Sequence, residues 1–253
     1  MHRRFVVLTI LSLACAPAWL LAQGGGPPSQ PQPPKNLQVL PKDMARGRVI
    51  EIMRGVAQGL GVRCEFCHVE GPDKSFQSMD FASDEKEMKK TAREMMKMAI
   101  DINTKYLGGV MGRTLTDRSM VRCVTCHHGL SKPRTLPSEV ATSYEGGGAD
   151  SAAAKYKMLR EKYYGRAAYD FGEMSLIEVA DELGRKPDQR QDAIKVLQMN
   201  LDYYPKSGPT FTALGNGSLQ LGDTAAAVSA YQRALEIDPE NPMAKRMLGV
   251  LKK

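Results

Sequence analysis

Two short motifs combine the residues of this chain that are best suited to bind a metal or a cofactor. Residues 64–68 read Cys-Glu-Phe-Cys-His, and residues 123–127 read Cys-Val-Thr-Cys-His. Thiols at this spacing can form disulfides, bind zinc, or form thioethers with the two vinyl groups of a haem. Disulfides and zinc leave the histidine after each pair without a role, whereas a haem uses its imidazole as the proximal iron ligand. The sequence therefore predicts two covalently bound c-type haems, with thioethers at Cys64, Cys67, Cys123 and Cys126 and proximal ligands at His68 and His127.

The opposite face of each iron needs a second ligand. Beyond residue 22 the chain carries three histidines, of which two follow the cysteine pairs and the third is His128. His128 is adjacent to His127 and cannot reach the far face of the same haem. It could reach the other iron, or lie as a polar neighbour or a propionate contact. Methionine is the natural alternative as a distal ligand.

The chain has 15 methionines, so their positions on helices must decide which of them bind iron. Met53 lies 11 residues before Cys64, on the apolar face of the helix that leads into the first motif. Met95 is central on the apolar face of a later helix, with Met98 on its flank and Met96 pointing elsewhere. The spacing favours Met53 for the first haem and Met95 for the second.

Two helices are expected to position these groups. The first is capped by Asp43, runs to about Leu60 and ends at Gly61. The second runs from about Asp84 to Leu107, after a loop at 69–83. Aliphatic residues on the apolar faces, such as Val56, Leu60 and Ile102, are expected to exclude water from the haems. The opposite face of the second helix is expected to be a solvated surface, with Lys86, Lys89, Lys90, Arg93 and Glu94.

The N-terminal residues resemble a targeting segment. A basic start is followed by an apolar run that ends in a small residue at Ala22. This pattern predicts a signal peptide over residues 1–22 and export to the periplasm. An uncleaved membrane anchor and a lipid on Cys15 are the alternatives. Residues 23–36 are rich in Pro, Gly and Gln and are expected to form a linker.

The C-terminal part contains a repeat with a period of 34 residues. Small residues, stops at Gly or Pro and helical patterns recur in the manner of tetratricopeptide repeats, which predicts a short helical-repeat domain with a final capping helix. The matching positions are Ala193, Leu197 and Pro205 in the first copy and Ala227, Tyr231 and Pro239 in the second. The first copy has Asn200 where alanine is usual.

The whole chain is therefore expected to be all-α. After the signal and the linker, the predicted units are a dihaem domain over 37–140, a linker over 141–150 and the repeat domain over 151–253. The formal net charge is +7, from 35 Lys and Arg against 28 Asp and Glu. Because the basic residues are scattered among acidic ones, no nucleic-acid partner is expected.

The segments "NLQVL", "VIEIMRGVAQGLGVRCEFCHVE", "TAREMMKMAIDINTKYL" and "VRCVTCHHGLSKP" together resemble the tetrahaem cytochrome subunit of photosynthetic reaction centres. The resemblance covers one two-haem half, roughly residues 36–134. It implies that the methionine on the helix before each motif is the distal ligand, which again falls on Met53 and Met95. The chain departs from the family in having one such half and in carrying the C-terminal repeats. The family's histidine beyond the second helix also has no counterpart after Tyr106.

These features predict an electron carrier rather than an enzyme. Iron held by both imidazole and thioether has no open position for a substrate, and it keeps the same ligands in both redox states. The expected partners are a redox donor and an acceptor, including a membrane-bound electron-transfer complex, and a protein bound at the repeats. The alternatives are a peroxidase-like dihaem enzyme with one open haem, and a repeat adaptor that uses its haems for sensing.

Overall fold

The structure is a computed structural model that describes residues 33–108 and 120–251. All regular secondary structure of these residues is helical, apart from an isolated antiparallel bridge between Val69 and Asp80. The predicted all-α class is therefore confirmed. The predicted signal at 1–22 lies outside the described residues. The α-helices are α1 (Arg46–Leu60), α2 (Glu87–Asp101), α4 (Cys123–His127), α5 (Leu136–Tyr163), α6 (Glu173–Gly184), α7 (Arg190–Tyr203), α8 (Gly208–Gln220), α9 (Thr224–Ile237) and α10 (Pro242–Leu251).

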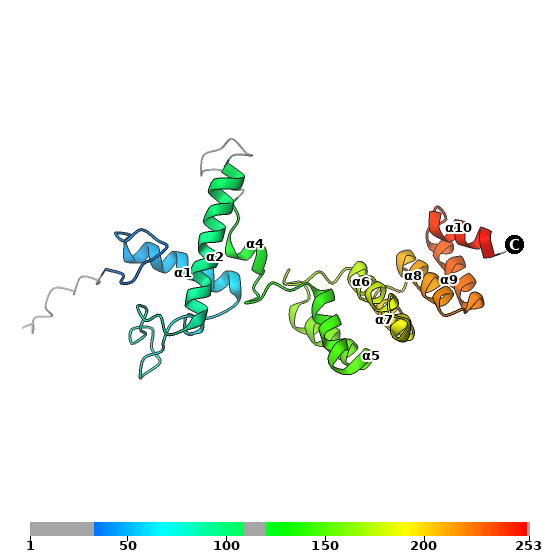
Figure 1. The fold of residues 1–253 in the computed structure, drawn as a ribbon, viewed down its shortest axis with the longest axis horizontal. Coiled ribbons are helices and arrows are strands. Elements are labelled where there is room, and N and C mark those ends of the chain that lie inside the picture. The colour runs from blue at the N-terminus through cyan, green and yellow to red at the C-terminus, as the bar shows by residue number, and fades with distance from the viewer. Residues whose placement is uncertain (1–32, 109–119, 252–253) are drawn as a thin grey trace, which may run out of the picture.

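Helices α1, α2 and α4 lie at one end of the molecule, and the remaining helices follow in a row (Figure 1). Helix α1 begins at Arg46, and no side chain caps its N-terminus. The predicted cap at Asp43 is wrong because a turn intervenes, closed by a bond from the Met44 N–H to the Pro41 carbonyl at 3.1 Å. The predicted end is correct: Gly61 adopts the left-handed conformation, with φ of 65°, and turns the chain toward the first motif.

Helix α2 begins at Glu87 instead of Asp84, because the Asp84 carboxylate pairs with side chains of the helix rather than capping it. The regular helix ends at Asp101 and continues as a π-helical segment, η2 (Ile102–Leu107). Wide turns of this kind often occur at functional sites. The Asn103 side chain in η2 donates to the Val121 carbonyl and accepts from the Val121 N–H, both at 2.8 Å. These bonds attach the end of the long helix to the residues just before the second motif.

Residues 141–150, predicted to be a linker, lie within α5. The helix breaks at Gly147 and Gly148, and Gly148 has φ of 70° and ψ of −162°, a conformation open essentially to glycine. The chain folds back at this break, since the Ser143 and Ser151 hydroxyls lie 2.9 Å apart. Helix formers on both sides of the two glycines explain why the segment is a helical hairpin.

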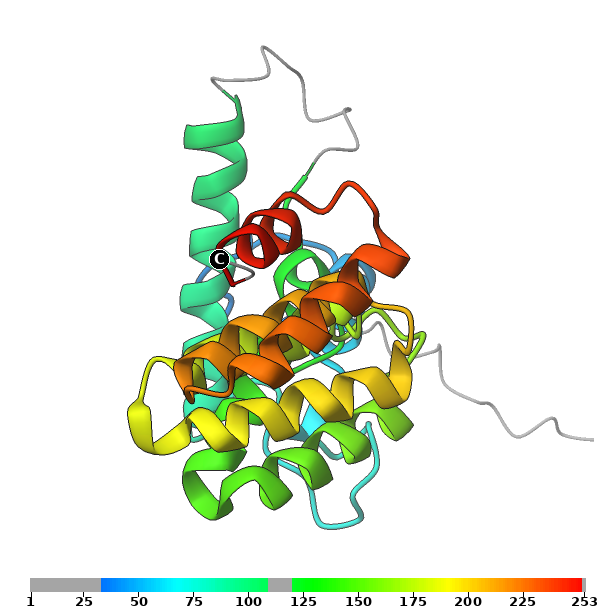
Figure 2. The same ribbon diagram turned by 90° about the vertical axis from the view of Figure 1, so that its right-hand side faces the viewer.

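Helices α6 and α7 pack as one pair and α8 and α9 as the next, with α10 against α9 (Figure 2). Helices α7 and α9 begin 34 residues apart, which equals the sequence period. Tyr231 is fully buried, and a Cβ atom at Gly215 would lie 2.5 Å from its ring. Asn200 is also fully buried, and its amide donates to the Glu173 carbonyl and the Thr210 hydroxyl, both at 2.8 Å. The assignment to tetratricopeptide-like repeats stays a prediction.

Residues 33–108 and 120–251 contain no helix with both the length and the apolar character needed to span a bilayer.

Candidate haem sites

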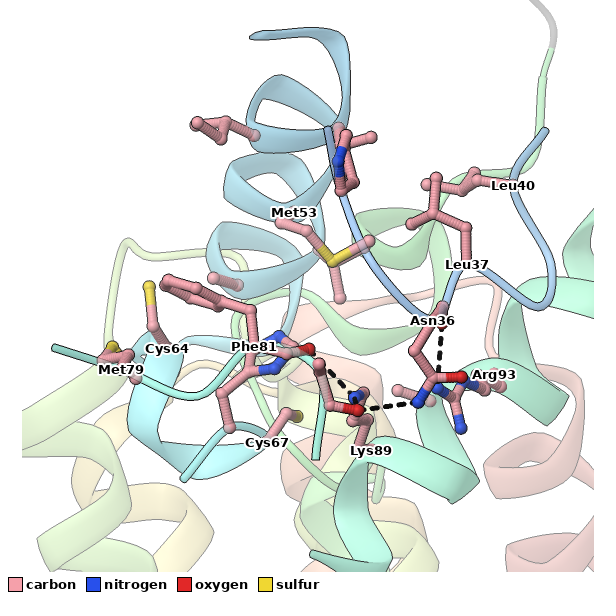
Figure 3. A pocket seen from close by; sticks show the side chains of 18 of the residues that line it. Asn36, Leu37, Leu40, Met53, Cys64, Cys67, Met79, Phe81, Lys89 and Arg93 are labelled. Carbon is pink, nitrogen blue, oxygen red and sulfur yellow. Dashed lines mark hydrogen bonds between the residues drawn. The ribbon is translucent and has the colours of Figure 1, made fainter. Parts of the chain in front are cut away.

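The first motif opens into a cavity of about 570 Å³. Helix α1, the loop that precedes α2, α2 itself and the segment 33–40 form its walls (Figure 3). The volume lies within the roughly 300–1,000 Å³ that is usual for cofactor sites. Four of the predicted site residues line this single cavity: Met53, Cys64, Cys67 and His68.

A single turn of chain brings the thiols and the imidazole of the first motif to this cavity. The 3₁₀ segment η1 (Cys64–Phe66) is closed by bonds from the Cys67 and His68 N–H groups to the Cys64 carbonyl, at 3.2 and 3.0 Å. Both cysteines are half-buried free thiols, and burial raises the pKa of the Cys67 thiol. Two free thiols on one turn, next to an imidazole in the same cavity, fit the attachment of a haem.

Met53 reaches the same cavity from α1. Figure 3 shows its thioether entering from the helix, with Cys67 and Phe81 beyond it on the other side of the space. Apolar neighbours on the same helix face, Val49, Ile50, Val56 and Leu60, also line the cavity. A sulfur atom held among apolar side chains suits a thioether ligand that must be kept from water.

Two further methionines line the cavity, and sequence reasoning gave neither of them a role. Met79 comes from the loop before α2, where no periodicity could have placed it. Met96 comes from α2, on the turn where Ala92 also faces the cavity. Met95 is not among the lining residues. It lies about 100° further round the helix than Met96 and is 41% exposed.

His68 is held by packing rather than by a hydrogen bond. Its Nδ1 atom is buried and has no hydrogen-bond partner among the described residues. The edge of the Phe81 ring packs on the imidazole, with ring centroids 5.1 Å apart and an interplanar angle of 66°. Burial, followed by the charge of Lys89, lowers the pKa of His68. This favours the neutral imidazole, which is the form that binds a metal.

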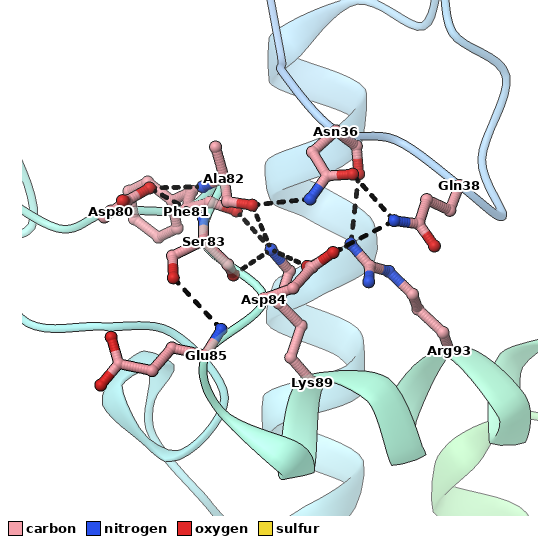
Figure 4. Close-up of polar contacts among 10 residues, drawn as sticks. All are labelled: Asn36, Gln38, Asp80, Phe81, Ala82, Ser83, Asp84, Glu85, Lys89 and Arg93. Atoms are coloured by element: carbon pink, nitrogen blue, oxygen red, sulfur yellow. Dashed lines mark hydrogen bonds and ion pairs between the residues drawn. The ribbon is translucent and has the colours of Figure 1, made fainter.

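Beside His68, a polar cluster fixes the loop over the cavity (Figure 4). The Lys89 ammonium donates to the carbonyls of Phe81, Ala82 and Ser83 at 3.0, 3.0 and 2.6 Å. It also pairs with Asp84 at 3.1 Å, and Arg93 pairs with the same carboxylate at 2.8 Å.

The Lys89 and Arg93 side chains are only 10% and 12% exposed. The expectation that this face is solvated is therefore wrong for these two residues, because loop carbonyls and a carboxylate replace water around them. Lys90 and Glu94 on the same helix do lie exposed, as expected.

The second motif forms the short helix α4 and packs against the end of α1. The Gly129 N–H donates to the Gly59 carbonyl at 2.9 Å. A Cβ atom at Gly59 would lie 2.8 Å from the Val124 nitrogen, so only glycine allows this approach. The two motifs are therefore parts of one packed unit.

The histidine of the second motif has a hydrogen bond at Nδ1, which the histidine of the first motif lacks among the described residues. His127 Nδ1 lies 2.8 Å from the Leu130 carbonyl, so the Nδ1–H tautomer donates there and leaves Nε2 for a metal. Burial raises the pKa of the Cys123 thiol, and Cys126 is exposed. His128 is exposed and does not line the first cavity.

The distal side of the second motif is less complete than that of the first. Met95 is 41% exposed on α2 and is not among the residues that line the first cavity. Three further large apolar side chains of α2 and α4 are also exposed: Met88, Met98 and Val124, at 42%, 48% and 49%. The role of Met95 stays a prediction.

Comparison with known proteins identifies the family. The chain is 27% identical over 191 residues to cytochrome c-554 of Chloroflexus aurantiacus, which covers 74% of this chain and 39% of that protein. The chain thus spans about two fifths of the length of this relative. Residues 14–169, more than half of the chain, match the family described as the photosynthetic reaction centre cytochrome C subunit. This range includes both motifs, α1 and α2, and the chain therefore belongs to that cytochrome family.

Proposed function

We propose that this protein is an exported electron carrier that holds two c-type haems, one at each Cys-x-x-Cys-His motif. Membership of a reaction-centre cytochrome family agrees with covalent haem and with electron transfer. The observation that carries the proposal is the convergence of Met53, Cys64, Cys67 and His68 on one cavity. These four residues are the complete protein ligand set of a six-coordinate c-type haem.

Each residue of the first site has a distinct role. Cys64 and Cys67 would hold the porphyrin by thioethers, His68 would bind the iron as the proximal ligand, and Met53 would bind it from α1. A bound haem supplies a reversible one-electron couple at its iron. If His68 and Met53 both hold the iron, the site would be suited to pass electrons and would leave no place on the iron for a substrate.

The cavity walls support this role by excluding water. Valine, isoleucine and leucine side chains of α1 line the site, and a low dielectric favours the less charged ferrous state. A neutral thioether ligand acts in the same direction. Both effects raise the reduction potential relative to a wet site with two histidine ligands.

At the second site, Cys123, Cys126 and His127 would hold the other haem, with Met95 as the distal ligand. Helix α2 supports this arrangement because it gives Met96 to the first cavity and turns Met95 to another side. The contact between α1 and α4 supports transfer between the two haems, since it packs the motifs into one unit.

Redox partners in a membrane electron-transfer complex would supply and accept the electrons. The helix pairs α6–α7 and α8–α9 offer a separate surface for docking a protein partner, which agrees with the tetratricopeptide-like spacing. The basic residues are scattered among acidic ones, which gives no support for nucleic-acid binding.

A haem count and an axial-ligand spectrum test this function. The full chain is produced with its signal segment in a host that attaches c-type haem. Mass spectrometry should show two haems per chain. The ferric protein should show the near-infrared charge-transfer band of methionine–iron ligation, and the reduced protein should not bind carbon monoxide. A single haem, or a high-spin iron that binds carbon monoxide in the wild-type protein, would contradict the proposal.

A further inference from the structure

The two proximal histidines of this protein are held in place by different means. His127 donates its Nδ1–H to the Leu130 carbonyl at 2.8 Å. His68 Nδ1 is buried without a partner among the described residues. A metal-binding histidine normally gives this hydrogen to a carbonyl or carboxylate, which fixes the ring. Something else must therefore fix the His68 imidazole.

Phe81 is the group in contact with that imidazole. Its ring meets the imidazole edge to face, with centroids 5.1 Å apart, and Phe76 packs behind it at 5.0 Å. The backbone secures the same contact, because the Asp80 N–H donates to the Val69 carbonyl at 3.0 Å. Asp80 and Val69 are the chain neighbours of Phe81 and His68. The position of the Phe81 ring therefore depends on the backbone of its loop.

Lys89 holds that backbone. A buried ammonium is destabilising unless it is paired and hydrogen-bonded, and Lys89 contacts three consecutive carbonyls and Asp84. The first of these carbonyls belongs to Phe81 itself. Arg93 holds the other side of the cluster by pairing with Asp84 and donating to the Asn36 carbonyl at 3.3 Å. Figure 4 shows these bonds converging on residues 81–84.

We propose that Lys89 is a positioning residue for the first haem: by fixing the backbone of Phe81, it presses the Phe81 ring against His68 and sets the orientation of the proximal imidazole. Through the aromatic contact, Lys89 takes the place at His68 of the hydrogen bond that His127 donates to the Leu130 carbonyl. The inference rests on the proposed function, since it concerns the haem held by His68.

Lys89 would affect the electronic properties of the haem as well as its geometry. The orientation of the imidazole plane determines the anisotropy of a low-spin ferric signal. Lys89 also lines the cavity, so its positive charge disfavours the ferric state of the haem there. Loss of Lys89 should therefore change the low-spin ferric signal of the haem at His68 and lower its reduction potential. The haem at His127 should keep its signal and its potential.

Four variants of the full-length holoprotein test this. K89M removes the ammonium, and K89R keeps its charge and donors. F81L removes the ring but keeps the lysine and its bonds to backbone carbonyls. K90M is the matched control, because Lys90 is exposed on the next residue of α2 and pairs with Glu87 at 2.6 Å. Each is measured by electron paramagnetic resonance of the ferric protein and by a redox titration that resolves the two haems.

K89M and F81L should shift the largest g value of one low-spin signal and leave the other unchanged. The g values of K89R should lie closer to those of the wild type than the g values of K89M do, and K90M should have the g values of the wild type. In K89M, the reduction potential of one of the two haems should fall. If K89M does not assemble, F81L carries the test. Unchanged signals in F81L, or equal changes in both haems, would overturn the proposal. A wild-type protein without two low-spin haems would instead reject the proposed function.

Discussion

The carbonyl of Gly59 accepts a hydrogen bond from the N–H of Gly129 at 2.9 Å. This bond joins the helix before the first motif to the residues just after the second. Gly61 also packs closely against Gly129, since a Cβ atom at Gly61 would be 2.1 Å from the Gly129 carbonyl oxygen. A close contact between glycines thus joins the segments that flank the two Cys-x-x-Cys-His motifs.

Replacing Gly59 by alanine should disturb both stability and the coupling of the haems. The new methyl group would lie 2.8 Å from the Val124 nitrogen and 3.0 Å from the Cys123 Cβ, so α1 and α4 must separate. Overpacking of this kind costs about 1–3 kcal/mol. Thermal unfolding followed by circular dichroism should show a lower Tm, and the magnetic coupling of the two ferric haems should weaken.

Gly55 provides the control for that experiment. It lies in the same helix, and a Cβ atom there would have no neighbour within 4 Å. G55A should raise stability by roughly 0.5–1 kcal/mol, because alanine is the better helix former. If G59A and G55A unfold at the same temperature, the close approach of α1 and α4 does not exist in solution.

Met53→Leu should open the iron of the first haem. Leucine keeps the apolar volume but has no sulfur to bind iron. The expected product has one haem that is high-spin and binds carbon monoxide when reduced, and one that is unchanged. M79L and M96L are the matched controls, because both thioethers line the same cavity. Carbon monoxide binding in M79L or M96L, with M53L inert, would transfer the distal role to that residue.

Met95→Leu should have the same effect at the second haem. The residue lies exposed on α2, away from the cavity that Met96 lines, so the first haem should keep its spectrum. Optical titration with carbon monoxide should show half of the total haem reacting. M98L serves as the control, since Met98 lies on the same helix and is also exposed. A reactive haem in M98L and none in M95L would identify Met98 as the ligand.

The sequence predicts those parts of the site that depend on local repeats and helix faces. Met53 reaches the cavity because a period of 3.6 residues places it with Val49 and Val56. The contributions of Phe81 and Met79 come from an irregular loop, and no period encodes which way a loop side chain points. The sequence of this loop shows apolar residues among polar ones, which does not indicate which of them line a cavity.

Charged residues show the same limit of sequence reasoning. Lys89 stands in a run with Lys86 and Lys90, and nothing in that run distinguishes the buried lysine from its exposed neighbour. Its burial is decided by three carbonyls of the preceding loop, which is a tertiary contact. The hairpin in α5 is a second feature that the sequence alone did not predict. Glycines at 147 and 148 indicate a break, but the chain continues as a helix on both sides.

Asp84→Asn should destabilise the protein in a manner that depends on pH. Arg93, with smaller contributions from Asn36 and Lys89, holds the pKa of the Asp84 carboxyl well below its usual range. An aspartate in an unfolded chain has a pKa of about 3.9. Because the folded pKa is lower, the ionised carboxylate stabilises the fold at pH values above the unfolded pKa, and this contribution is lost as pH falls through the folded pKa.

The Tm of D84N should therefore lie below that of the wild type at pH 7, and the two Tm values should converge as the pH is lowered below about 4. D101N is the control, because Asp101 makes only an exposed pair with Lys105 at 2.8 Å, and such pairs contribute about 0–1 kcal/mol. A gap between D84N and wild type that stays constant from pH 7 to the acid limit would show that the ion pairs of Asp84 do not stabilise the loop.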